Sequence, residues 1–308
     1  MLPLCSYNNL IGSYNGPIIV LLVILFNRIF ALEKLIVELN NGNEMKVIKR
    51  IFVLLLLVAL LAISYGVWVL YGSTTSNPHN YRCLGDIPTP YGYQRIMGDD
   101  PDFSVFLRSL PLKGKGAEVE LFTGGTARFQ SLNYAVVNLP LLSNAEQCAD
   151  VCMRLRAEYL FNKGLCGSIL FKDVNGKTIR YQGGSSRKAF ERYLRNLYGV
   201  ASTFSLSREL KQRRLADIQP GDVFVYAAVD RPGPHKYGHA VMVVDVARNP
   251  RTGKKAFLLA EGNTPARNIH VMRNLENPFR SPWFMLDEDA EGLILSVFPY
   301  KANELRHF

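Results

Sequence analysis

The feature that most constrains this chain is an uncharged apolar run over residues 51–71, which begins IFVLLLLVALLA. A segment of this length and composition can cross the hydrocarbon core of a bilayer as one helix. Lys46, Lys49 and Arg50 precede the run, whereas residues 73–80 after it contain no Lys, Arg, Asp or Glu. Because Lys and Arg are retained on the cytoplasmic side, we expect the C-terminal part of the chain to be exported.

The same segment also has the plan of a secretory signal, because Met45 is followed by basic residues and then by an apolar core. Cleavage after the helix is therefore the alternative to anchoring. Tyr71-Gly72-Ser73 is a poor cleavage site, so we favour an uncleaved signal anchor over residues 45–72. Residues 1–44 hold a second apolar run at 17–26. Since Met45 resembles a translation start, we interpret these residues as an upstream extension or a second apolar segment.

The remainder of the chain is predicted to be a stalk at 73–84 and one exported domain over 85–308, a length that supports its own hydrophobic core. The chain has a net charge of +10. Of its 36 Lys/Arg and 26 Asp/Glu, 5 and 3 precede Thr74, which leaves +8 for the rest. Such a charge favours anionic partners, here lipid head groups, peptidoglycan or another anionic envelope polymer. Export argues against nucleic acid.

Four cysteines follow the apolar run, at Cys83, Cys148, Cys152 and Cys166. An oxidising compartment permits disulfides, but four cysteines in a domain of this size are too few for a disulfide scaffold. Free, buried thiols are the alternative to disulfides, and the sequence does not choose a pairing.

The pattern of elements predicts an α+β domain. Helical spacing of apolar residues predicts helices over 144–162, 187–198 and 207–215, the first opened by a capping box at Ser143–Glu146. Strand composition predicts strands over 117–122, 134–139, 223–227, 239–246, 256–261 and 293–298. Short loops between consecutive strands favour an antiparallel sheet, with the helices segregated earlier in the sequence.

Two residues are the first candidates for chemistry. Cys148 lies near the N-terminal end of a predicted helix, where the helix dipole favours a nucleophilic thiolate. Its spacing from Cys152 on an apolar face equally suits a buried structural thiol. His239 opens a strand that is apolar on both faces, so it lies where a loop enters a central strand and is the candidate base. A structural histidine that caps the loop is the alternative.

The next strand supplies a third member. Asp245 shares a predicted face with His239 but lies roughly 20 Å away along the strand, too far to orient it. If residues 246 and 247 pair with 257 and 256, His239 faces the region 261–264. Glu261 and Asn263 share a face there, and either could hold the imidazole by its other nitrogen. Gln147 is the candidate donor to an oxyanion.

We predict no metal site and no cofactor. His235 and His239 are four residues apart, but His235 follows Pro232, Gly233 and Pro234, so it lies in a loop where helical ligand spacing has no meaning. The sequence also contains no glycine-rich phosphate loop.

Several short segments together resemble an exported bacterial family, the domain of unknown function 4846, across residues 85–308. They are Leu110–Lys113, Gln147–Asp150, Gly221–Phe224, Gly238–Val241 and Ile269–Val271. The resemblance implies an inner-membrane protein with its domain on the periplasmic side, and it supplies no activity. Where the family usually has Gln at the end of the strand after the His strand, this chain has Glu261.

The order of the candidate residues is also similar, more loosely, to NlpC-type papain-like cell-wall hydrolases. In those enzymes a Cys begins a helix, a Pro-Gly-Asp turn opens a strand, a His begins the following strand and a polar residue lies on the next. Cys148, Pro220–Asp222, His239 and Glu261 or Asn263 follow this order, although Cys148 is deeper in its predicted helix. The likeness implies a cysteine amidase or peptidase. The alternative is a non-catalytic envelope domain that binds wall polymer or a protein partner through its basic surface.

Overall fold

The structure is a computed structural model that describes residues 44–71, 76–231, 237–277, 279–287, 291–295 and 298–308. The chain divides into two compact units, Met1–Trp68 and Val69–Phe308. The apolar run forms a helix as predicted, within α3 (Glu44–Tyr71). Its segment Val47–Gly66 has a mean hydropathy of 2.6 and is long enough to cross a membrane, which suggests secretion or membrane anchoring. The interpretations of residues 1–43 and of stalk residues 72–75 fall outside the described residues.

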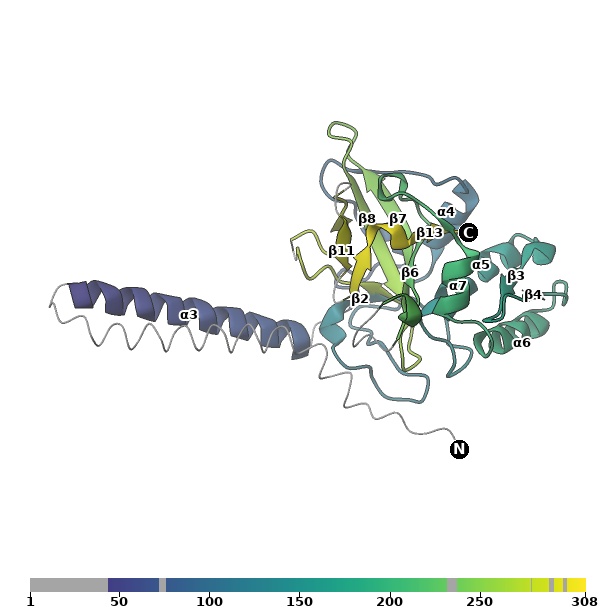
Figure 1. Ribbon diagram of the computed structural model, residues 1–308, viewed down its shortest axis with the longest axis horizontal. Helices are drawn as coiled ribbons and strands as arrows, with labels where there is room; N and C mark the ends of the chain where they lie inside the picture. Colours follow the sequence, from purple (N-terminus) through teal and green to yellow (C-terminus); the bar gives the residue numbers. More distant parts are fainter. Residues whose placement is uncertain (1–43, 72–75, 232–236, 278, 288–290, 296–297) are drawn as a thin grey trace. The chain divides into compact units, whose positions relative to one another are not determined.

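The second unit is a mixed α+β domain, as predicted (Figure 1). Its α-helices are α4 (Pro101–Ser109), α5 (Cys148–Asn162), α6 (Arg187–Tyr198) and α7 (Thr203–Glu209). Its strands are β1 (Gln94–Arg95), β2 (Asn133–Val136), β3 (Leu170–Lys172), β4 (Thr178–Arg180), β5 (Lys211–Gln212), β6 (Val223–Tyr226), β7 (His239–Arg248), β8 (Lys255–Glu261), β9 (His270–Met272), β10 (Phe284–Met285), β11 (Gly292–Leu295), β12 (Phe298–Lys301) and β13 (Leu305–His307). The helices precede the central strands, although β1 comes before them and β2 to β4 lie among them.

One large antiparallel sheet organises this domain. Within the described residues it has the order β2-β9-β8-β7-β6-β13-β5, with β1 also paired to β7 and β10 to β8. Each of these pairings is antiparallel, which confirms the predicted sheet. The hairpins β3–β4 and β11–β12 form two smaller sheets.

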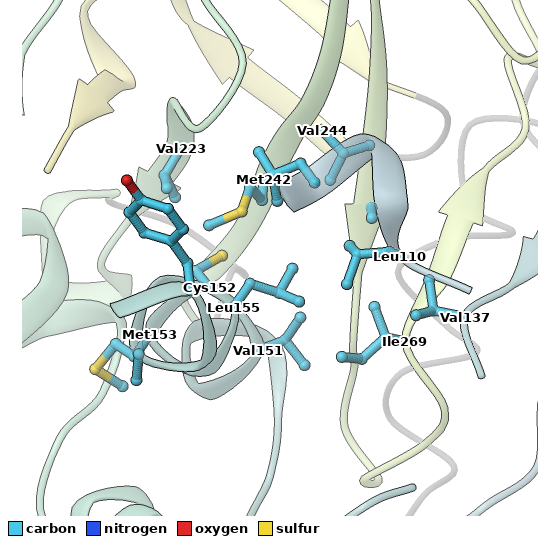
Figure 2. Packing of buried hydrophobic residues seen from close by; sticks show 14 of the residues in the cluster. Leu110, Val137, Val151, Cys152, Met153, Leu155, Val223, Met242, Val244 and Ile269 are labelled. Carbon is cyan, nitrogen blue, oxygen red and sulfur yellow. The ribbon is translucent and has the colours of Figure 1, made fainter. Parts of the chain in front are cut away.

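Helices α4, α5 and α7 lie against one face of the large sheet, and α6 packs on α5. Leu107, Leu155, Leu194 and Leu206, one from each helix, share a buried cluster with Met242 of β7. Figure 2 shows the α5 side of this cluster, where Leu155 and its neighbours face the strands. An amphipathic helix gains most of its stability from burying such a face, so this packing fixes the position of α5.

The hairpin β11–β12 covers the opposite face. Leu295, Phe298 and Tyr300 of the hairpin pack with Val241 of β7 and Phe257 of β8 in a second buried cluster. The prediction of a single strand over 293–298 was therefore incomplete, since the chain turns back there and residues 298–301 form the partner strand. Residues 296 and 297 fall outside the described part of the chain.

The central strand β7 is rich in β-branched residues and buried on both faces, as its sequence predicts. Its pairing with β8 has a bulge between Val243 and Asp245. A bulge inserts one unpaired residue and so exchanges the faces of all residues beyond it. Asp245 therefore lies on the helix-covered face together with Ala247, and its predicted place on the face of His239 was wrong.

Three other predicted elements differ from the structure. The helix predicted from residue 144 begins only at Cys148, because the Glu146 side chain accepts a hydrogen bond from the Leu142 amide and pairs with Arg154 instead of capping a helix. The strand predicted at 117–122 forms only isolated bridges, since the side chain of Gln130 binds both backbone groups of Val119.

The helix predicted over 207–215 was displaced. Ser202 caps α7, its side chain accepting the hydrogen bond of the Phe204 amide, so the helix occupies Thr203–Glu209. The chain then becomes extended, and Lys211–Gln212 pairs with β13. The pairing partner lies almost a hundred residues later in the chain, which local spacing cannot reveal.

Candidate active site

The first turn of α5 positions Cys148. Gln147 is the N-cap residue, with extended backbone angles, and its amide donates a hydrogen bond of 2.9 Å to Asp150 Oδ2. Cys148 is therefore the first helical residue rather than one deeper in the helix, and its side chain is 8% exposed. At this position the thiol lies at the positive end of the helix dipole, beside backbone amides that have no partner within the helix.

A buried ion pair holds the segment before Cys148. Arg154, in the third turn of α5, donates to Glu146 Oε1 at 2.5 Å, and both side chains are almost fully buried. Glu158 adds a second carboxylate to Arg154 and accepts two hydrogen bonds from Arg187 of α6. A buried network of this kind fixes geometry because breaking it would leave an uncompensated buried charge.

A glycine allows α5 to approach the end of β8. A Cβ atom at Gly262 would lie 2.6 Å from Cγ2 of Val151 and 3.3 Å from the carbonyl oxygen of Gln147. A real side chain does not tolerate the first of these distances. Gly262 therefore permits the close packing that brings the start of α5 to the residue before it, Glu261.

His239 begins β7 opposite Tyr226 of β6. Its ring stacks on Phe298, with centroids 3.8 Å apart and planes inclined by 22°. The preceding residue, Gly238, has no space for a side chain, since a Cβ there would meet Thr203 at 2.2 Å. The imidazole is thus held on one side by an aromatic ring and is buried.

Glu261, at the end of β8, connects two histidines. Its Oε2 lies 2.6 Å from His239 Nε2 and its Oε1 lies 3.2 Å from His270 Nε2. His270 faces Glu261 across the β8–β9 pairing, and its Nδ1 lies 2.9 Å from the carbonyl oxygen of Asn268. Cys148 lies beside His239, and its charge and a side-chain hydrogen bond both act to raise the pKa of the imidazole. A Cys–His–Glu–His group is the result.

The charges of this group reinforce one another. Burial lowers the pKa of His239, but the charges and hydrogen bonds of Cys148 and Glu261 outweigh it and raise the pKa to about 9. Burial likewise acts to raise the pKa of Glu261, yet the two histidines hold it well below its usual range. At neutral pH the site therefore holds an imidazolium against a carboxylate.

The structure places the other candidates differently. The side chain of Asn263 accepts a hydrogen bond from the amide of Thr264, whereas Glu261 contacts the imidazole. Gln147 Oε1 accepts from the Thr264 hydroxyl at 2.9 Å, beside the start of α5. In the described part of the chain no group of three His, Cys, Asp or Glu is arranged to hold a metal ion, and His235 lies outside that part.

His270 was missed as a site residue. It occurs within Ile269–Val271, one of the segments that carry the family resemblance, and a histidine between apolar residues in a strand was the available signal. Its role depends on the three-residue strand β9, which pairs with β8 after a loop and is too short for periodicity to detect.

Fold and site together define a mixed α+β domain with a buried Cys–His–Glu–His group, preceded by an apolar helix. The family model described as domain of unknown function 4846 matches residues 85–184 and 182–307, so the chain belongs to this family. No curated protein and no solved structure matches the chain. The looser likeness to papain-like cell-wall hydrolases therefore has no support from these comparisons.

Proposed function

We propose that this protein is an envelope cysteine hydrolase that cleaves amide or peptide bonds of the cell wall. The observation that carries the proposal is the position of Cys148 at the start of a helix, beside the imidazole of His239, whose Nε2 lies 2.6 Å from Oε2 of Glu261. A thiol acyl-transfer site consists of a nucleophile, a base and an orienting carboxylate that contact one another in this order.

The chemistry proceeds in two balanced stages. The Cys148 thiolate attacks the carbonyl carbon and forms a C–S bond, and as the C–N bond breaks the His239 imidazolium gives its proton to the leaving amine. A thioester remains. His239 then removes a proton from water, which attacks the thioester carbon, and the C–S bond breaks to release a carboxylic acid and to restore the Cys148 thiolate beside the His239 imidazolium. Glu261 keeps the imidazole oriented throughout.

The start of α5 also supplies donors for the oxyanion of each stage. The backbone amide of Cys148 is one of the first amides of the helix and needs no intrahelical acceptor. Gln147 is the N-cap residue and lies outside the helical backbone. Its side-chain oxygen Oε1 already accepts a hydrogen bond from the Thr264 hydroxyl. The amide nitrogen of its side chain is the second donor, which supports the role predicted from the sequence.

The location of the substrate follows from the rest of the chain. The apolar run over residues 51–71, with Lys46, Lys49 and Arg50 before it, supports an uncleaved anchor that leaves the domain on the outer side of a bacterial inner membrane. The net charge of +8 after Thr74 suits an anionic polymer such as peptidoglycan. Peptide and amide bonds of that polymer are the substrates within reach of such a site.

A non-catalytic binding domain explains the structure less well. The basic segment Lys211–Arg214, a candidate for its contact surface, is partly neutralised within the domain, because Arg213 pairs with Asp222 and Asp99 while Arg214 pairs with Asp217. Such pairs reduce the positive field available to a polymer. A binding domain also gives no reason to bury a thiol against a histidine and carboxylate.

The test compares Cys148→Ala with Cys166→Ala in the full chain, purified in detergent micelles. Both variants lose one thiol, and the Cys166 thiol donates to the carbonyl of Gly184, away from His239 and Glu261. With peptidoglycan fragments as substrate, we expect Cys148→Ala to lose hydrolysis by roughly 1,000-fold or more, and Cys166→Ala to retain it. Equal hydrolysis by wild type and Cys148→Ala, measured by the release of free amines, would refute the nucleophile.

A further inference from the structure

The surroundings of His270 determine its protons. The ring is buried, with 2% of the residue exposed. Nδ1 lies 2.9 Å from the carbonyl oxygen of Asn268, and Nε2 lies 3.2 Å from Oε1 of Glu261. A carbonyl oxygen only accepts hydrogen bonds, and so does a carboxylate oxygen. Each ring nitrogen of His270 therefore faces an atom that requires a proton from it.

A neutral His270 cannot satisfy both contacts. A neutral imidazole carries one N–H, so its other nitrogen would point a lone pair at an oxygen lone pair in a buried site, without water to relieve it. The missing proton could instead sit on Glu261, but an imidazole is more basic than a carboxyl group by roughly 2 pKa units. Glu261 also accepts a short hydrogen bond from His239 at 2.6 Å, which favours its charged form.

We propose that His270 is a buried imidazolium that holds Glu261 from the side opposite His239 and acts as a positioning residue for the Cys148–His239 pair. The ring itself touches no reacting atom. It fixes one carboxylate oxygen, so the other oxygen is aimed at His239. The effect on catalysis rests on the proposed function, whereas the protonation of His270 does not.

The charge balance of the site supports this assignment. In the thiolate form that the proposed mechanism uses, Cys148 gives the group a net charge of −1 together with the His239 imidazolium and the Glu261 carboxylate. A positive His270 brings the buried group to zero. The neighbouring Cys152 and Tyr300 add no negative charge, because burial raises their pKa values well above the ordinary ones and keeps both side chains neutral.

A positive His270 also limits how strongly Glu261 attracts the proton of His239. The carboxylate shares its charge between two imidazolium rings, so His239 can still release its proton to a leaving amine. Without His270 the full carboxylate charge acts on His239 and through it on Cys148. Removing a positive charge from this group should therefore shift the ionisation of the thiol to higher pH.

The first experiment measures the protons of His270 directly. The full chain contains five histidines, so ¹⁵N-histidine labelling in detergent micelles gives few ring signals, and the signals lost in His270→Gln assign those of His270. We expect two protonated nitrogens on His270 at pH 7. One protonated and one bare nitrogen would overturn the imidazolium. This result does not depend on hydrolysis, so it stands or fails separately from the proposed function.

The second experiment tests positioning. The rate of Cys148 alkylation by iodoacetamide is measured against pH in the wild type, in His270→Gln and in His79→Gln, whose histidine is exposed. We expect the midpoint to rise by roughly one pH unit in His270→Gln only, as for the loss of one nearby charge in a protein interior. An unchanged midpoint in a folded His270→Gln protein would overturn the positioning role.

Discussion

Two buried carboxylates on neighbouring central strands have different partners. Asp245 of β7 is fully buried and forms ion pairs with Arg95 at 2.6 Å and with Arg108 at 2.8 Å. The carboxylate of Glu261 in β8 contacts the imidazole rings of His239 and His270. Each carboxylate is thus held between two cationic or potentially cationic side chains, and the two sites differ in the kind of cation.

The kind of cation indicates whether each carboxylate contributes to stability or to reactivity. A guanidinium stays protonated throughout the physiological range, so Asp245 and its arginines have one charge state and serve to attach β1 and α4 to the sheet. An imidazole changes its charge near neutral pH, so the carboxylate of Glu261 controls groups that can pass protons on. We therefore expect substitutions at Asp245 to affect stability and substitutions at Glu261 to affect reactivity.

The largest expected effect is that of Asp245→Ala. It leaves two arginines facing an empty buried site, and we expect it to lower the free energy of unfolding by about 3 kcal/mol, because a broken buried ion pair typically costs this much. Urea unfolding followed by the fluorescence of the buried Trp283 measures the change. The fraction that remains folded should alkylate Cys148 at the wild-type rate. A loss of thiol reactivity without a loss of stability would contradict the comparison.

Glu261→Gln should show the reverse pattern. Gln keeps the size of the side chain but removes the charge that holds the His239 proton, so we expect kcat/KM for hydrolysis to fall roughly 100-fold. The midpoint of urea unfolding should move less than that of Asp245→Ala.

Asn263→Ala is the matched control, since Asn263 was the other candidate orienter and its side chain binds only the Thr264 amide in the described structure. We expect less than about a threefold loss of activity in this variant. A larger loss of activity in Asn263→Ala than in Glu261→Gln would show that Asn263, and not Glu261, orients His239.

The sequence was sufficient where contacts are local. The predicted pairing of residues 246 and 247 with 257 and 256 is confirmed, because a short turn and strict alternation determine the register of a hairpin. The predicted limits of α6 are also confirmed, since Ser186 caps it and its apolar face is strongly periodic. These signals placed His239 opposite the end of the next strand.

The sequence was insufficient where distant segments compete for a group. The start of α5 depends on the ion pair of Glu146 with Arg154, which prevents Glu146 from capping the helix. The face on which Asp245 lies depends on a β-bulge that contains no glycine and so leaves no signal in the sequence. The choice of Glu261 over Asn263 depended on which side chain reaches the imidazole, which the register of the hairpin does not determine. His270 joined the site only through a pairing across β9.

A third buried carboxylate, that of Asp150, extends the comparison between Asp245 and Glu261. Asp150, in the first turn of α5, binds the Gln147 amide through Oδ2, while its Oδ1 has no hydrogen-bond partner among the described residues. Within the described residues no arginine or histidine forms an ion pair with it. Burial consequently raises its pKa to about 7, with a contribution from the charge of Glu146.

Asp150→Asn should therefore have the smallest effect, and one that depends on pH. Because the folded pKa lies above the unfolded value of 3.8, protonation of Asp150 stabilises the fold fully below about pH 4, and this contribution is lost as the pH rises through 7. We expect Asp150→Asn to be more stable than the wild type at pH 8, by about 1 kcal/mol, and to lose that advantage at pH 5. Urea midpoints at both pH values measure this, with Asp217→Asn, at a half-buried carboxylate, as control. A difference that is independent of pH would show that Asp150 is held as a permanent carboxylate, like Asp245.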